Sequence, residues 1–150
     1  METLFEQNLI PRILFSVIAV MLIIGPSAAD FNKTHATNPL WPPHARFHVV
    51  WQVLSNACIS LVALYLLWTP SSEYLTHLYV AAALNFIWGL NFYITLATMP
   101  LYGGALRDVN GIKPFRFNVF GTVREVDTNL FGGTILMTLN LIGFLLIQTA

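Results

Sequence analysis

The sequence predicts an all-α integral membrane protein that folds as an up-down bundle of four transmembrane helices. Hydrophobic residues make up 56% of its 150 residues and charged residues only 9%, whereas soluble proteins average about 25% charged residues. Four apolar stretches are each close to the roughly 20 residues that a helix needs to cross a bilayer. Because unpaired backbone groups are costly in lipid, we expect all four stretches to be helical.

The predicted helices cover about residues 11–28, 44–68, 74–99 and 130–149, within a single transmembrane domain of residues 1–150. Prolines mark several of their ends, since a proline lacks the N–H that a helix interior needs. The second and third helices are joined by only a few residues, which predicts an antiparallel pair. The first stretch could instead be a signal peptide. Its leader is acidic rather than basic, so we expect a retained helix.

Basic residues gather on the loops at one end of the predicted bundle. The loop before the second helix contributes Lys33, and Arg46 lies at the start of that helix. The loop between the third and fourth helices holds Arg107, Lys113, Arg116 and Arg124. The opposite side has only Arg12. The positive-inside rule therefore predicts a multi-pass protein with both long loops in the cytoplasm and both termini outside the cell or in a lumen.

The segment between the third and fourth helices, residues 101–129, is too long for a plain connection. Asn110 and Gly111 form a typical hairpin-turn pair. Residues 115–119 alternate apolar and polar side chains, which is the period of a strand. The sequence therefore predicts a small β-hairpin or cap that lies on the cytoplasmic face of the bundle.

Histidine and charged side chains crowd into residues 30–48, although the chain is poor in charge. His44 and His48 are four residues apart, which places both imidazoles on one face of a helix. Imidazole titrates near neutral pH and can move a proton. We therefore predict a catalytic group in this segment. Its candidate members are His44, His48, Asp30, His35 and Arg46.

Polar side chains also continue from that end into the predicted helices. On the second helix they follow a step of four residues, and the third and fourth helices add further amides. Because polar groups in a membrane span normally face the bundle interior, these rows are expected to converge on one cavity. The candidate substrate-binding residues are Asn32, Trp41, Trp51, Gln52, Asn56, Asn85, Trp88 and Asn140.

Three interpretations of the His-rich segment remain open. In the first, His35, His44 and His48 bind zinc or iron, with Asp30 as a fourth ligand. In the second, a metal-free histidine acts as acid and base, Asp30 orients it, and Arg46 holds a substrate oxygen. In the third, the polar residues serve only helix packing and anchoring at the membrane interface.

We expect an integral membrane enzyme that acts on a small lipophilic substrate by His-based acid–base chemistry, with or without a metal. An isomerase, cyclase or lyase needs little more than a placed acid and base. The alternative is a non-enzymatic accessory subunit or a binder of lipophilic small molecules. Under either interpretation, the expected partners of the protein are the lipid bilayer and the small molecule. The sequence leaves open whether the protein forms a homo-oligomer. A formal net charge of zero gives no support for nucleic-acid binding.

One stretch is distinctive as a motif. It reads Asn-Lys-Thr-His at residues 32–35, then Asn-Pro at residues 38–39 and Trp-Pro-Pro-His-Ala-Arg-Phe-His at residues 41–48. This stretch resembles the signature of an uncharacterised family of short four-span membrane proteins. Outside it, the agreement extends only to length and to the number of spans. The resemblance implies the fold and a membrane location, and it implies no activity.

Overall fold

The computed structural model describes residues 3–149 as a bundle of long helices with a small two-stranded sheet. In chain order the elements are α1 (Leu4–Gln7), α2 (Leu9–Asp30), α3 (Pro43–Trp68), α4 (Tyr74–Thr98), the short 3-10 helix η1 (Met99–Leu101), β1 (Phe115–Val119), β2 (Thr122–Val126) and α5 (Thr128–Leu145). Within these residues, α2, α5, α3 and the α4–η1 unit are long and apolar enough to cross a membrane. The four predicted helices are thereby confirmed as helices.

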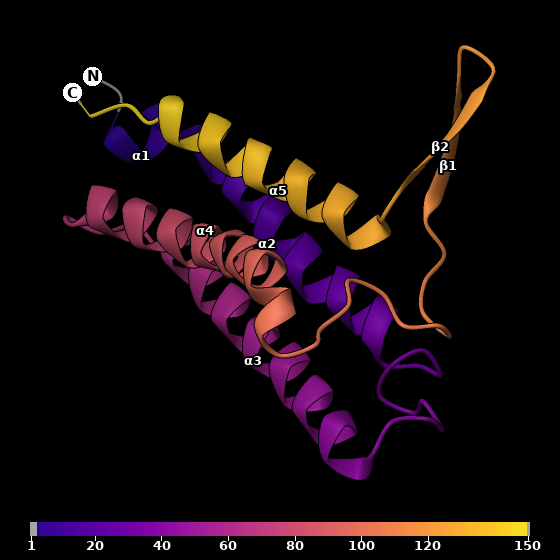
Figure 1. Ribbon diagram of the computed structural model, residues 1–150. Helices are drawn as coiled ribbons and strands as arrows, with labels where there is room; N and C mark the ends of the chain where they lie inside the picture. Colours follow the sequence, from indigo (N-terminus) through magenta and orange to yellow (C-terminus); the bar gives the residue numbers. More distant parts are fainter. Residues whose placement is uncertain (1–2, 150) are drawn as a thin grey trace.

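The four long helices form a closed ring. Helix α3 packs between α2 and α4, and α5 packs against both α2 and α4. Helix α1 and the end of α5 lie together at one end of the bundle, as Figure 1 shows. There the Asn8 side chain donates to the Gln148 carbonyl at 3.0 Å and accepts from the Gln148 N–H at 2.9 Å. This pair ties the start of α2 to the segment after α5.

Three of the long helices begin and end within two residues of the predicted bounds, and α5 differs more. It ends at Leu145, whereas the prediction extended it to residue 149. The apolar run continues past Leu145, so hydropathy gave no stop signal. The N–H of Gln148 is instead used by Asn8, which removes it from the helical pattern.

The core lies in the half of the bundle next to α1. It is built from Phe15, Ile18, Leu22, Ala63, Leu67, Tyr74, Leu78, Ala81 and Ala82. Small residues let the helices approach closely in this half. A Cβ on Gly143 of α5 would lie 2.6 Å from a ring carbon of Phe15. The Phe15 ring therefore occupies the space that a side chain at position 143 would need.

Helix α2 contains a proline whose missing N–H is compensated from another helix. Pro26 lies inside α2, so the Leu22 carbonyl, one turn earlier, lacks its usual helical donor. Asn56 of α3 donates from Nδ2 to this carbonyl at 2.7 Å. A side chain of α3 thus completes the backbone hydrogen bonding of α2.

The hairpin that the sequence predicts does form, but around a different turn. Strands β1 and β2 pair antiparallel with Val119 opposite Thr122, so Phe120 and Gly121 form the turn. Their φ angles are 50° and 80°, as a tight two-residue hairpin turn requires. The sequence prediction had placed the turn about ten residues too early.

The predicted turn pair, Asn110 and Gly111, makes only a local turn. The N–H of Gly111 donates to the Asp108 carbonyl, and no strand precedes this turn within the described residues. A turn signal without two flanking strands cannot make a hairpin, which is why this prediction was wrong. The hairpin also projects sideways from the bundle (Figure 1) and does not cover its end as the predicted cap would.

Candidate functional site

A cavity of about 520 Å³ lies between α2, α3, α4 and α5, at the end of the bundle opposite α1. Residues of the two long loops, 31–42 and 102–114, complete its wall. Most of the wall is apolar and aromatic. Its polar side chains are Asp30, His35, Gln52, Asn56, Thr95, Thr128 and Asn129. A cavity of this size and character suits a small lipophilic molecule.

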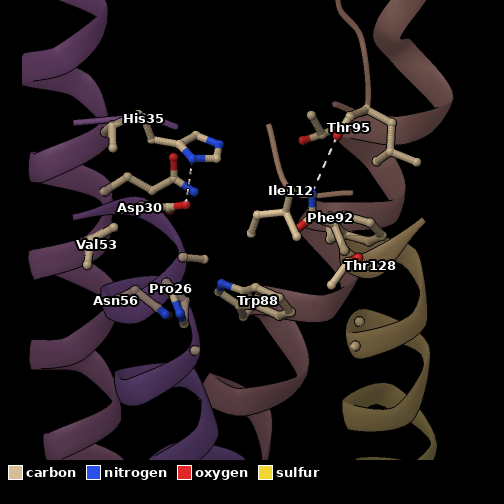
Figure 2. A pocket seen from close by; sticks show the side chains of 18 of the residues that line it. Pro26, Asp30, His35, Val53, Asn56, Trp88, Phe92, Thr95, Ile112 and Thr128 are labelled. Atoms are coloured by element: carbon tan, nitrogen blue, oxygen red, sulfur yellow. Dashed lines mark hydrogen bonds and ion pairs between the residues drawn. The ribbon is translucent and has the colours of Figure 1, made fainter. Parts of the chain in front are cut away.

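Figure 2 shows how the labelled side chains lie around the cavity. His35 and Asp30 are on one side, and Phe92, Thr95 and Ile112 are on the other. The indole of Trp88 lies between these two walls, at the end of the cavity away from His35. A bound molecule would therefore meet an aromatic surface at one end and an imidazole with a carboxylate at the other.

The loop that carries His35 is held by bonds from Asn32 to the backbone. Asn32 donates from Nδ2 to the carbonyls of Ala28 and Ala29, at 2.9 and 3.0 Å, at the end of α2. Its Oδ1 accepts from the Thr34 N–H at 2.8 Å. Asn32, a candidate substrate-binding residue, is therefore used in building the loop, and it does not line the cavity.

A second asparagine fixes the remainder of this loop. Asn38 is fully buried, donates to the Thr34 carbonyl at 3.0 Å and accepts from the Leu40 N–H at 3.0 Å. Local bonds of this kind are typical of asparagine in turns. The hydrogen bonds of Asn32 and Asn38 explain three polar positions of the sequence motif. The third is Thr34, which is the partner of both asparagines.

Trp41 connects the two long loops. Its indole N–H donates to Asp108 Oδ2 at 3.1 Å. The pKa of Asp108 is held below its ordinary value, first by the Asn110 N–H and then by this indole. Arg46 donates from Nε to the Trp41 carbonyl at 3.1 Å. Arg46 is thus a positioning residue for Trp41, and it does not line the cavity.

The hydrogen bonds around His35 assign its tautomer. His35 Nδ1 lies 2.8 Å from Thr34 Oγ1 and 3.5 Å from Asp30 Oδ1. The Thr34 hydroxyl donates to Asn32 Oδ1 at 2.7 Å, because that oxygen can only accept. Thr34 must therefore accept from His35, which places the proton of the neutral ring on Nδ1.

The other ring nitrogen of His35 is left available. Because the proton of the neutral ring is on Nδ1, Nε2 keeps its lone pair. The contacts of the ring nitrogens within residues 3–149 all involve Nδ1. The ring also meets Trp41 edge to face, with centroids 5.2 Å apart. An imidazole with a fixed tautomer, a free Nε2 and a carboxylate near Nδ1 has the arrangement of a general base.

His44 and His48 lie outside the cavity, on the outward face of α3. Their Nε2 atoms are 3.0 Å apart, and both side chains are exposed. Val53 of the same helix is buried. His44 lies nine residues earlier, about 180° around the helix at 100° per residue, which explains its outward position.

The three histidines of the predicted metal set are not brought together. No group of three His, Cys, Asp or Glu side chains that could hold a metal ion occurs in the described part of the chain. His35 pairs with Asp30 at the cavity, whereas His44 and His48 face each other on α3. The exposed pair alone offers two nitrogen ligands.

The remaining candidate substrate-binding residues fall into three groups. Trp41, Gln52, Asn56 and Trp88 line the cavity. Trp51 points outward and is 59% exposed. Asn85 and Asn140 are buried and bind backbone carbonyls, those of Phe15 and Ala82, at 3.0 and 3.2 Å. These two amides join helices to each other and lie outside the cavity wall.

Sequence reasoning missed the part of the cavity wall that α4 and η1 supply. Trp88 was predicted, but Phe92, Thr95 and Met99 were not. These three cavity residues follow Trp88 at steps of four, three and four residues. This spacing keeps the side chains on one helix face. Asn85 lies three residues before Trp88, so the same spacing could have extended the prediction from these two candidates to the rest of this helix face.

A family model described as a family of unknown function (DUF6640) matches residues 14–111. The match spans most of α2, the loop with His35, α3, α4 and the Asp108 turn, and it stops before the hairpin and α5. No curated protein matches the chain significantly, and neither does any solved structure.

Proposed function

The chain belongs to the DUF6640 family, a family of unknown function, and we propose that it is a multi-pass membrane enzyme that acts on a small lipophilic molecule in the cavity. The observation that carries this proposal is one His–Asp pair in the wall of a largely apolar cavity. Four apolar helices support the membrane location. The basic loops support a cytoplasmic position for the cavity end.

The proposed chemistry is proton transfer by His35. Its Nε2 accepts a proton from a C–H or O–H of the substrate, and the resulting imidazolium is stabilised by Asp30, 3.5 Å from Nδ1. In an isomerisation or cyclisation the same proton returns to another atom of the substrate, so no co-reactant is needed. In an elimination the proton passes to the leaving group. A positioned acid–base residue contributes roughly 10²–10⁴-fold to the rate.

Two histidine sites compete for the catalytic role, and variants separate them. Membranes with the wild-type protein are incubated with an organic extract of cells that lack it, and the products are compared by mass spectrometry. We expect His35→Gln to abolish the new product, because glutamine cannot shuttle a proton. We expect His48→Gln to retain it, because His48 faces away from the cavity.

The opposite result would return the catalytic role to His44 and His48, the pair that the sequence favoured. Thermal unfolding in detergent shows whether either variant is misfolded. Asp30→Asn is the graded variant. It keeps the size of the side chain but removes the charge that stabilises the imidazolium, so the rate should fall while substrate binding persists.

A non-enzymatic binder of lipophilic molecules is the second candidate function. The apolar character of most of the cavity wall favours it, because such a wall needs no catalytic group to hold a ligand. A binder would carry an unchanged molecule through purification in detergent, in stoichiometric amount, with His35→Gln as well as with the wild type. An enzyme would instead release a product that the extract did not contain.

A further inference from the structure

The tip of the β1–β2 hairpin presents an aromatic ring at a strained position. Phe120 has a φ of 50°, and it is the only non-glycine residue with a positive φ within residues 3–149. Left-handed backbone costs an ordinary residue roughly 1–2 kcal/mol, and hairpin turns of this kind favour Asn, Asp or Gly. Phe120 is also fully exposed. The hairpin turn requires this backbone conformation but not an aromatic side chain, and the described chain does not shield Phe120. We therefore look for a contact of Phe120 outside the chain.

One face of the hairpin continues the outward surface of α5. Strand alternation puts Phe115, Phe117 and Val119 on the same face. The rings of Phe115 and Phe117 lie 5.2 and 6.4 Å from the ring of Phe131, between centroids. Phe131 is in the first turn of α5, within a candidate membrane span, and is 40% exposed. The aromatic face of the hairpin is therefore contiguous with a surface that would meet lipid.

The direction of the hairpin fits the same surface. Figure 1 shows it leaving the loop end of the bundle sideways, across the direction of the helices. If the four helices cross a bilayer, a hairpin in this position runs along the bilayer surface. Its other face carries Arg116, Asn118, Val123 and Glu125, and three of these four side chains are polar and suited to water.

The charges around the hairpin leave two basic side chains uncompensated. The acidic residues of segment 102–127 are already bound within the chain; they are Asp108, Glu125 and Asp127. Glu125 accepts from Arg116, with 2.8 Å between the charged atoms. Lys113 and Arg124 have no ion-pair partner among residues 3–149. Arg124 lies on the aromatic face itself, opposite Phe117, and Lys113 lies two residues before β1. Two such basic groups match anionic lipid headgroups, which attract basic side chains by about 1 kcal/mol each.

We propose that the hairpin is a membrane-surface anchor that inserts Phe120 and its aromatic face into the headgroup layer. Lys113 and Arg124 contact anionic headgroups beside it. This inference rests on the proposed insertion of the four helices. The anchor would hold segment 102–114, which lines the cavity, at the bilayer surface from which a lipophilic molecule would come.

The test measures the depth of two neighbouring residues that point to opposite faces. In a Cys58→Ser background, Val119→Cys and Asn118→Cys are each labelled with an environment-sensitive fluorophore, and Phe120 stays intact. The protein is reconstituted into phosphatidylcholine vesicles with and without phosphatidylglycerol. We expect brominated phospholipid to quench the label at position 119 and aqueous iodide to quench the label at position 118. The anionic lipid should increase this difference.

A turn variant separates lipid contact from hairpin formation. Phe120→Asn suits the left-handed turn better, so the hairpin should persist while quenching by brominated lipid at position 119 falls at least twofold. Lys113→Gln with Arg124→Gln should remove the effect of phosphatidylglycerol and leave the contrast in pure phosphatidylcholine. Equal iodide quenching at positions 118 and 119 would overturn the proposal. Shielding of position 119 that disappears on dilution with excess lipid would identify a second copy as the partner, which would also overturn it.

The native Cys58 distinguishes failure of the anchor from failure of membrane insertion. It is exposed on α3, inside a candidate span. Labelled in the otherwise unchanged chain, it should be quenched by brominated lipid. If it is quenched while position 119 stays open to iodide, insertion stands and the anchor fails. If Cys58 is not quenched, the membrane proposal fails, and the anchor fails with it.

Discussion

Asn56 and Pro26 act as one bonding unit although they belong to different helices. Pro26 removes the donor for the Leu22 carbonyl, and Asn56 supplies a replacement at 2.7 Å. A buried carbonyl without a donor is unfavourable, and in a membrane span no water is at hand to replace it. Asn56 therefore has a structural role at the edge of the cavity that it also lines.

A double-mutant cycle measures the coupling between Asn56 and Pro26. Asn56→Leu keeps the side-chain volume and removes the donor, so we expect it to lower the free energy of unfolding by roughly 1–2 kcal/mol. In a Pro26→Ala background the backbone N–H gained at position 26 can serve the Leu22 carbonyl, and the same substitution should then cost less than half as much. Unfolding in detergent gives both values. Equal penalties in the two backgrounds would show that the two residues are not coupled.

At the scale of elements, α3 shows why the polar row of the sequence does not form a single inward seam. A step of four residues turns by about 40° on a helix. From His44 to Ser60 the row therefore turns through about 160°, and its ends face opposite sides. Ser60 is buried, whereas His44 is exposed. Only the later part of the row, from Gln52 to Ser60, faces the cavity or the other helices.

The helices could be predicted from the sequence because an apolar run of sufficient length is a local property. The inward face could not, because in a span that faces lipid the outer surface is as apolar as the packed one. Trp51 and Trp88 illustrate this, since one points outward and the other lines the cavity. The role of Asn32 and Asn38 was also hidden, because their partners are backbone groups of their own loop.

The close contact between α5 and α2 requires a glycine at position 143, whereas Gly132 of α5 has open space around it. At Gly143 a Cβ would lie 2.6 Å from the Phe15 ring, which is fully buried, whereas at Gly132 nothing lies within 4 Å. We expect Gly143→Ala to lower the free energy of unfolding by roughly 1–3 kcal/mol through overpacking.

Gly132→Ala in the same helix is the matched control and should be neutral or stabilising by up to about 1 kcal/mol, because alanine favours a helix. Thermal unfolding of the two variants in one detergent compares them directly. A Gly143→Ala protein as stable as the wild type would contradict the close α2–α5 contact. Phe15→Leu, which shortens the ring side chain, should partly rescue Gly143→Ala.

At the scale of the whole molecule, the two ends of the bundle differ in character. The end next to α1 is packed and tied by Asn8 and Gln148. There Arg12 is only 4% exposed, and its guanidinium carbon lies 3.6 Å from the centre of the Phe5 ring and 4.7 Å from that of Trp68. The other end is hollow, carries both long loops and holds the remaining basic residues. The cavity and the basic loops lie at the same end of the bundle. The proposed membrane orientation therefore places the cavity on the cytoplasmic side.

Cysteine accessibility in intact cells tests that orientation together with the number of spans. In a Cys58→Ser background, Lys33→Cys and Lys113→Cys place thiols on the two long loops, and Ser72→Cys places one on the short α3–α4 turn; all three positions are exposed. Because basic loops stay in the cytoplasm, we expect an impermeant maleimide to label Ser72→Cys only. The two loop positions should react once the membrane is permeabilised. Labelling of the loops alone would invert the orientation. Labelling of all three positions from outside would contradict four spans. Helix α3 runs from the cavity end to the α3–α4 turn, so these two ends must lie on opposite sides of the bilayer if the bundle crosses it.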